Sequence, residues 1–208
     1  MNIAPAIRAT VAAATDHNRP IIALRGIALV DVRRDFPSTV IGRTMAYRDP
    51  SLVQFVSQHH DAVFYTTQPN DADTFTEEMD RLRAVWRHHQ DLEWGGIGYH
   101  TYGFPSGRLY LVGGFDTQRA NVAGRNHQSI AHCSAGDYTL RTPAIATQLV
   151  AAMATIAAWA HQRRLLAVLS HHDAALATSP TDCCGATRHL WVPRIPEAIR
   201  AIARQLPA

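Results

Sequence analysis

The sequence contains little cysteine and no block of like charge. Its three cysteines, Cys133, Cys183 and Cys184, cannot build a disulfide framework, and a bond between the neighbours Cys183 and Cys184 would be strained. A reduced compartment or a role in metal binding is the more natural interpretation of these thiols. The 20 basic and 17 acidic residues are scattered along the chain, and a net charge of +3 without a run of Lys or Arg predicts neither a nucleic-acid nor a membrane partner.

Long apolar runs are also missing. No stretch reaches the roughly 20 apolar residues that a helix needs to cross a bilayer. The first 14 residues hold a short apolar stretch interrupted by Arg8, without the basic start and long apolar block of a secretory signal. We therefore expect a protein that is made and kept in the cytoplasm unless another factor releases it.

What the sequence does contain fits one folded unit. Its 208 residues, 47% of them apolar and 18% charged, can bury one good core, and no internal repeat or low-complexity linker interrupts them. Strand-like and helix-like segments alternate, which predicts a single α/β domain with a mixed central sheet of about five or six strands flanked by helices. We expect residues 1–50 to form an N-terminal extension packed on the main domain, residues 51–208.

Local patterns place the expected elements along the chain. Thr74 and Glu77 have the spacing of a capping box, and the apolar residues behind them recur at helical spacing to about Gln90. Thr142 caps a second, alanine-rich helix with Pro143 at its first position. The remaining expected elements are strands at residues 27–30, 52–56, 97–104, 108–112, 129–133 and 165–169, and a short last helix from Pro196.

The chain has 12 histidines, which include three adjacent pairs: His59-His60, His88-His89 and His171-His172. The first and third pairs each follow a predicted strand, whereas the middle pair lies in the last turn of a helix, where the helix dipole gives it a structural interpretation. A zinc site needs three or four nitrogen or sulfur donors, and a catalytic zinc keeps one position open for water. His59, His171 and Cys183 fit such a set, but spacing alone leaves hydrogen-bonded core histidines equally open.

Seven segments between residues 52 and 200 occur in the order of one known family. They are LVQFVSQHH at 52–60, WGGIGYH at 94–100, GRLY at 107–110, NHQSI at 126–130, TP at 142–143, SHHD at 170–173 and SPTDC at 179–183. By this order the chain resembles the zinc-dependent peptidoglycan amidases, which include bacteriophage lysozyme-amidases and the animal peptidoglycan recognition proteins. The resemblance implies that bacterial peptidoglycan is the partner and that the amide bond between N-acetylmuramic acid and L-alanine is hydrolysed.

The same resemblance implies the roles of five residues. His59, His171 and Cys183 correspond to the ligands of a zinc ion, with the first histidine of each pair carried over. Tyr99 corresponds to the family's active-site tyrosine, and Thr181 to a Lys or Thr two positions before the ligand cysteine. Zinc would lower the pKa of a bound water and polarise the carbonyl. Tyr99 would orient that water or donate a hydrogen bond to the developing oxyanion, and Thr181 would do the latter.

Three further residues are weaker expectations for substrate binding: His100, Asn126 and His127. Each of the two histidines is as readily explained as a hydrogen-bonded structural residue. Cys184 stands where the family usually has proline, so the resemblance identifies the loop but leaves the choice of thiolate between the two neighbouring cysteines open.

The first ligand depends on the alignment of the first segment. Shifting that segment to residues 62–66 would remove the histidine ligand altogether. We prefer His59, because residues 55–58 have strand character and a histidine follows them.

Two other functions remain open from the sequence. Some relatives keep the fold and bind peptidoglycan after losing a ligand, and a zinc hydrolase of this kind could also act on another amide. The presence of all three candidate ligands favours the enzyme. Without a signal segment, we expect a monomeric endolysin of the phage type that waits in the cytoplasm and acts on the cell wall after release.

Overall fold

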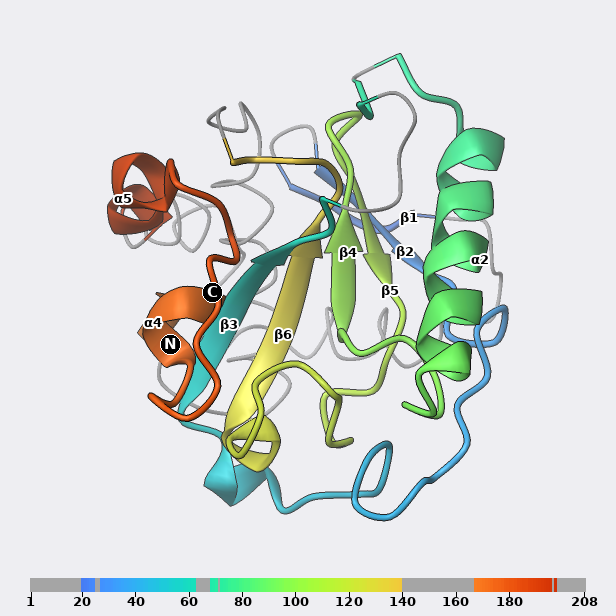
Figure 1. The fold of residues 1–208 in the computed structure, drawn as a ribbon. Helices are drawn as coiled ribbons and strands as arrows, with labels where there is room; N and C mark the ends of the chain where they lie inside the picture. The colour runs from blue at the N-terminus through green and yellow to red at the C-terminus, as the bar shows by residue number, and fades with distance from the viewer. Residues whose placement is uncertain are drawn as a thin grey trace, which may run out of the picture.

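The computed structural model describes residues 20–24, 27–62, 68–70, 72–139, 167–195 and 197. These residues form one mixed, seven-stranded sheet flanked by helices, which confirms the predicted α/β class (Figure 1). The sheet exceeds the predicted count of strands because Pro20–Leu24 adds an antiparallel strand at one edge. The helices predicted from Thr142 and from Pro196 lie outside the described residues.

The strands are β1 (Pro20–Leu24), β2 (Ile27–Asp31), β3 (Phe55–His60), β4 (Thr101–Gly103), β5 (Arg108–Leu111), β6 (Ser129–Ser134) and β7 (Ala167–Ser170). Their order in the sheet is β1-β2-β5-β4-β6-β3-β7. The neighbours β4, β6, β3 and β7 all run parallel, whereas β5 runs antiparallel to β4. The carboxyl ends of β3, β6 and β7 therefore lie along one edge of the sheet.

Two strands, β3 and β4, start at least three residues later than predicted, each for a local reason. β3 starts at Phe55 rather than at residue 52, because residues Pro50–Leu52 form a short 3-10 helix, η1, capped by the Asp49 side chain. β4 is shorter than predicted because residues 97–100 form a loop ahead of it. In both cases the apolar composition did not distinguish the strand from the turn ahead of it; Leu52 in η1 is exposed, whereas Ile97 in the loop before β4 is buried.

The long helix α2 (Phe75–Asp91) begins with the predicted capping box. Thr74 Oγ1 accepts the Glu77 N–H at 3.3 Å, and the Glu77 carboxylate accepts the Thr74 N–H at 2.7 Å. The helix then packs on the sheet through Met79, Leu82 and Val85, each of which contributes roughly 1.5–3 kcal/mol by burial.

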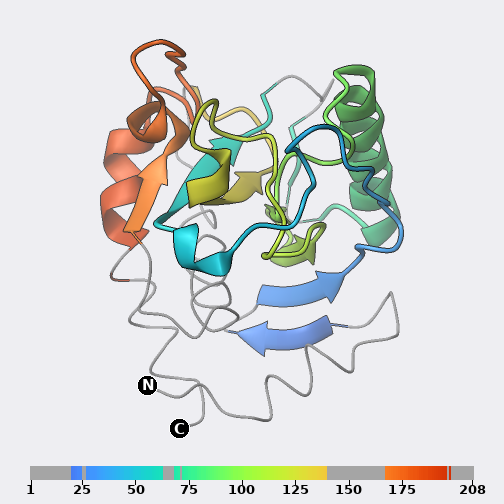
Figure 2. The same ribbon diagram turned by 90° about the horizontal axis from the view of Figure 1, so that it is seen from below.

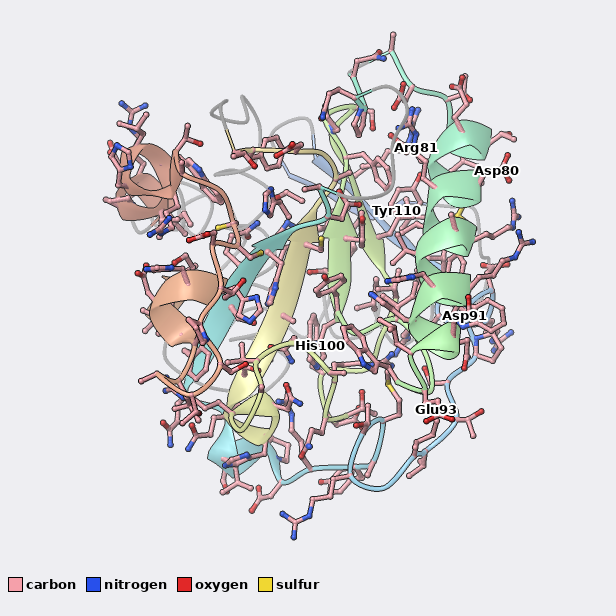
Figure 3. The ribbon with its side chains drawn as sticks, in the orientation of Figure 1. Asp80, Arg81, Asp91, Glu93, His100 and Tyr110 are labelled. Atoms are coloured by element: carbon pink, nitrogen blue, oxygen red, sulfur yellow. The ribbon has the colours of Figure 1, made fainter. Side chains whose placement is uncertain are left out.

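A buried carboxylate also joins α2 to the sheet. Glu78 has no exposed surface, and it accepts a hydrogen bond of 2.5 Å from the Tyr110 hydroxyl and forms a 2.9 Å ion pair with Arg108. Figure 3 shows Tyr110 lying between the sheet and α2. These partners offset the cost of removing the carboxylate from water.

The other described helices are short. They are α4 (His171–Ala174), α5 (Arg188–Trp191) and the 3-10 helices η1, η2 (Asn126–Gln128) and η3 (Val192–Arg194). Both views place α4 and α5 on the far side of the molecule from α2, and Figure 2 shows β1 and β2 side by side at the sheet edge. In the part of the chain that the structure describes, no helix has the length and apolar character needed to cross a membrane.

Candidate metal centre

Two parallel strands bring the first and third histidine pairs together. β3 and β7 pair with Gln58 opposite Ser170, so both strands end at the same edge of the sheet. The next residues, His59 and His171, lie side by side with their ring centroids 4.3 Å apart. Ser170 Oγ caps α4 by accepting the Asp173 N–H at 3.0 Å, so the chain turns into the helix at His171.

Cys183 reaches the same point from the loop that follows α4. The His172 N–H donates to the Cys183 carbonyl at 2.6 Å, and the His60 N–H donates to Cys183 Sγ at 3.4 Å. The sulfur then lies 3.8 Å from His59 Nδ1. Cys184 is fully buried and stands outside this group, so the structure places Cys183 beside the two histidines.

The donor set is compatible with a metal ion. One atom from each of His59, His171 and Cys183 lies within 4.8 Å of the others, and tetrahedral bonds of about 2.0–2.3 Å to a zinc ion would bring these atoms to about 3.3–3.8 Å from one another. Burial lowers the pKa of His59 well below its ordinary value and that of His171 to about 4, so both rings are neutral and offer a lone pair. Burial also raises the pKa of Cys183 to about 12, so metal binding must displace a thiol proton.

A cavity of about 680 Å³ opens at these donors. Cys183 lines it, and the donor atoms of His59 and His171 lie within 4.8 Å of the Cys183 sulfur. The wall comes from the end of β3, the end of α2 and the loop around Cys183, and it includes His60, Asp61, His88, His89, Trp94, Tyr99, Thr181 and Arg188. This volume is in the range of small-molecule sites, about 300–1,000 Å³.

Tyr99 and Thr181, the two residues predicted to assist chemistry, both line the cavity. The Tyr99 ring centroid is 5.1 Å from that of His59. Burial, reinforced by Cys133 and Cys183, raises the pKa of Tyr99 well above its ordinary value, so the hydroxyl keeps its proton and can donate. Thr181 Oγ1 accepts the Cys183 N–H at 3.2 Å, which uses a lone pair of that oxygen rather than its proton.

The middle histidine pair lies in the wall of this cavity as well. His89 Nδ1 accepts the Gly98 N–H at 3.2 Å, so the neutral ring carries its proton on Nε2. Its ring stacks on Trp94 with centroids 4.6 Å apart, and burial lowers its pKa to about 4. The structural interpretation from the helix dipole was incomplete, because His89 is held neutral and His88 faces the cavity. The sequence feature that could have placed this pair at the cavity is the short link between the end of α2 and the segment that contains Tyr99.

Sequence reasoning missed Asp61, which follows the first histidine pair. It is buried, lines the cavity and accepts the Gly136 N–H at 2.6 Å. The neighbouring His60 Nδ1 accepts the Tyr138 N–H at 3.1 Å. The second histidine of the pair therefore fixes the loop at residues 136–138, while the first faces the donor cluster.

The three weaker substrate-binding expectations lie elsewhere. Asn126 and His127 precede β6, which runs parallel to β3 with Phe55 opposite Ser129, so they lie at the opposite end of the sheet from His59. Asn126 Oδ1 accepts two backbone N–H groups of its own loop, at 2.9 and 2.7 Å. Neither residue lines the cavity, and their predicted role in substrate binding stays a prediction.

His100 also takes the structural alternative. It lies in the interior with no exposed surface (Figure 3). Its Nδ1 accepts the Ala131 N–H at 2.9 Å, and its Nε2 donates to the Thr117 carbonyl at 3.0 Å. Both ring nitrogens are thus hydrogen-bonded to the backbone, which favours the structural explanation of His100, and its role in substrate binding stays a prediction.

Comparison with known proteins finds similarity in the fold of the chain but not in its sequence. No model of a protein family matches the chain, and no curated protein matches its sequence. Solved structures do match. Drosophila peptidoglycan recognition protein-LB has a TM-score of 0.62 at 19% identity, covering 81% of this chain and 92% of its own. Peptidoglycan recognition protein-LE, solved in complex with tracheal cytotoxin, gives 0.61 at 18% identity, with 81% and 91% covered.

An enzyme is among the matching structures too. The N-acetylmuramoyl-L-alanine amidase LysC from Clostridium intestinale has a TM-score of 0.55 at 16% identity, and the match covers 85% of this chain and 97% of LysC. These identities establish a common architecture. The chain therefore has the fold shared by the peptidoglycan recognition proteins and this N-acetylmuramoyl-L-alanine amidase.

Proposed function

We propose that the chain is a zinc-dependent amidase that hydrolyses the bond between N-acetylmuramic acid and L-alanine in bacterial peptidoglycan. The observation that carries the proposal is the convergence of His59, His171 and Cys183, from three separate segments, beside a cavity. Three protein ligands leave a fourth position of a tetrahedral zinc open, which is the arrangement of catalytic rather than structural sites. The amidase fold supports the same reading.

The side chains around the donors supply what amide hydrolysis needs. Zinc, when bound by these three ligands, lowers the pKa of a water molecule and polarises a carbonyl group. Tyr99 lines the cavity with its ring centroid 5.1 Å from that of His59, and its protonated hydroxyl can donate to the amide oxygen as that oxygen gains negative charge. Thr181 offers a second hydroxyl at the cavity wall, from the loop that carries Cys183.

The cavity wall indicates how a glycopeptide would be held. His89 offers a fixed N–H, and Arg188 provides a cation at the wall. The indole of Trp94, stacked on His89, adds an apolar surface suited to a sugar ring or a side chain. Peptidoglycan stem peptides carry both carbonyl and carboxylate groups, which match these donors.

Mass spectrometry of peptidoglycan digested by the zinc-loaded protein tests the proposal. We expect free stem peptides that begin with L-alanine, together with unbroken glycan strands. The His171→Ala variant, which lacks one donor, should release none. Binding to the wall without product would overturn the amidase and support the binding module, a reading favoured by the neighbour solved in complex with tracheal cytotoxin.

The biological role that we propose is that of an endolysin, active on the wall after release from the cytoplasm. Expression together with a membrane-permeabilising protein should lyse the host, whereas expression alone should not. Survival of the host in the first case, with active enzyme in the extract, would contradict this role without affecting the amidase proposal.

A further inference from the structure

A chain of buried hydrogen bonds leads from the loop at residues 119–121 to the metal cluster. Ser57 and His59 lie on the same face of β3, since side chains two apart in a strand point the same way. Ser57 Oγ is 3.2 Å from His59 Nε2 and 2.8 Å from Asn121 Oδ1. All three side chains are buried, so their hydrogen bonds form without competition from bulk water.

The protons along this chain can be assigned from its fixed end. Asn121 Nδ2 donates to the Arg119 carbonyl at 2.7 Å, and a carbonyl can only accept, so the amide nitrogen must face it. The amide oxygen therefore faces the other way, where it accepts from the hydroxyls of Ser57 and Ser129 at 2.8 and 2.7 Å. The Ser57 hydroxyl has a single proton, and it donates this proton in its hydrogen bond to Asn121 Oδ1.

The consequence reaches the metal cluster. Because the Ser57 proton is committed to Asn121, Ser57 Oγ can only accept from His59, and His59 Nε2 must carry the ring proton. The other nitrogen, Nδ1, is then bare, and it is the atom that lies 3.8 Å from Cys183 Sγ. Partners of this kind commonly orient a metal-binding histidine and raise its affinity for the metal.

We infer that Ser57 and Asn121 are positioning residues that lock His59 in the tautomer with a lone pair on Nδ1, ready for a metal ion. The inference rests on the proposed metal site. Ser129 shares Asn121 with Ser57 but does not touch His59, so it serves as an internal control. Neither serine lines the cavity, which separates this role from substrate binding.

The tautomer itself is measurable before any metal is added. Long-range ¹H–¹⁵N spectra of the metal-free protein, with the His59 ring identified by its loss in His59→Gln, should show Nε2 protonated and Nδ1 bare. Ser57→Ala should produce a mixture of the two tautomers. A proton on Nδ1 in the wild-type protein would overturn the inference, whether or not the alanine variant folds.

Zinc affinity, measured by competition with a chromophoric chelator, gives a second readout. We expect Ser57→Ala to weaken zinc binding by about 10–100-fold and Ser57→Thr, which keeps the hydroxyl, to restore it. Ser129→Ala should bind zinc like the wild type. Equal zinc affinity of Ser57→Ala and the wild type would overturn the positioning role of Ser57 and Asn121 but leave the amidase proposal standing. A wild type that binds no zinc yet shows the Nε2–H tautomer of His59 would overturn the amidase proposal and support the tautomer assignment.

Discussion

The parallel strands carry buried polar side chains at both of their ends, but the two ends use them differently. At the carboxyl end of β3, the donor atoms of His59, His171 and Cys183 face one another beside a cavity. At the amino end of β6, Arg48 donates to the carbonyls of Asn126, Ser129 and Phe115. The first group brings metal-ligating side chains from three segments together beside a cavity, whereas Arg48 pairs with backbone carbonyls of the chain itself.

This difference indicates that the carboxyl end of the parallel strands forms a binding site and that the amino end has a structural role. Buried polar groups are normally paired, so an arginine whose partners are backbone carbonyls indicates structure, whereas histidine and cysteine donor atoms that converge beside a cavity indicate a ligand. Substitutions at the carboxyl end should therefore change metal binding and catalysis with little effect on stability. Substitutions at the amino end should do the reverse.

The largest effect is expected for Cys183→Ser at the carboxyl end. Loss of the thiolate removes one of three ligands, and we expect zinc to be lost and peptidoglycan hydrolysis to fall at least about a thousandfold, since several kcal/mol of transition-state stabilisation disappear. Metal analysis and product assays check both. Cys184→Ala is the matched control and should keep its zinc. Zinc loss in Cys184→Ala but not in Cys183→Ser would show that Cys184 is the ligand and would contradict the prediction.

Arg48→Ala should destabilise the fold at the amino end of the parallel strands. Three carbonyls lose their donor in the interior, so we expect the free energy of unfolding to fall by about 3 kcal/mol or more. Urea denaturation measures this loss, and the chelator assay should give unchanged zinc affinity for the folded variant. Zinc loss without a loss of stability would contradict the division between the two ends.

Two tyrosines sharpen the comparison because each has a different task. Tyr99→Phe removes the hydroxyl of a cavity-lining tyrosine whose ring centroid is 5.1 Å from that of His59, and we expect kcat to fall on the order of 100-fold with zinc content unchanged. Tyr110→Phe removes the hydroxyl that binds buried Glu78, and it should lower stability by about 1–3 kcal/mol while leaving kcat intact. Steady-state kinetics and denaturation on both variants decide the matter. Equal kcat values would remove Tyr99 from the chemistry.

A buried histidine between the ends makes stability depend on pH. Burial lowers the pKa of His132 to about 3, so below the unfolded value near 6.5 the unfolded chain binds the proton more readily. Its contribution is complete above about pH 6.5 and is lost as the pH falls towards 3, at about 1.4 kcal/mol per pH unit.

His132→Gln isolates this contribution in the metal-free protein. Glutamine can keep hydrogen bonds to Thr101 and Ser134 but does not titrate. Denaturation at a series of pH values should show a shallower decline for the variant than for the wild type. Parallel curves would mean that His132 is protonated in the folded protein.

Much of the fold could be predicted because its signals are local. Short stretches of sequence indicate the capping box at Thr74 and Glu77, the apolar strands, and the histidines at the ends of β3 and β7. The strand order and the pairing of Pro20–Leu24 were beyond such patterns, because they depend on contacts between distant segments. The predicted extension of residues 1–50 stays a prediction.

The site was predicted in part for the same reason. Strand ends identified His59 and His171, but no local pattern indicates that Ser57 shares a proton with Asn121, since they lie far apart in sequence and meet only in the fold. Asn126 lies at the opposite end of the parallel strands from His59, and its motif alone does not reveal that position.

The smallest expected effect compares two histidines outside the metal cluster. His88 lines the cavity at the end of α2, whereas His127 lies at the opposite end of the parallel strands, in η2. If the cavity holds the glycopeptide, His88→Ala should weaken binding of a soluble muropeptide about fivefold, the loss of one hydrogen bond of about 1 kcal/mol, and His127→Ala should change nothing. Calorimetric titration of both variants measures the affinities. A weaker affinity in His127→Ala alone would move the substrate to the end that this structure assigns to scaffold, and the division between the two ends would fail.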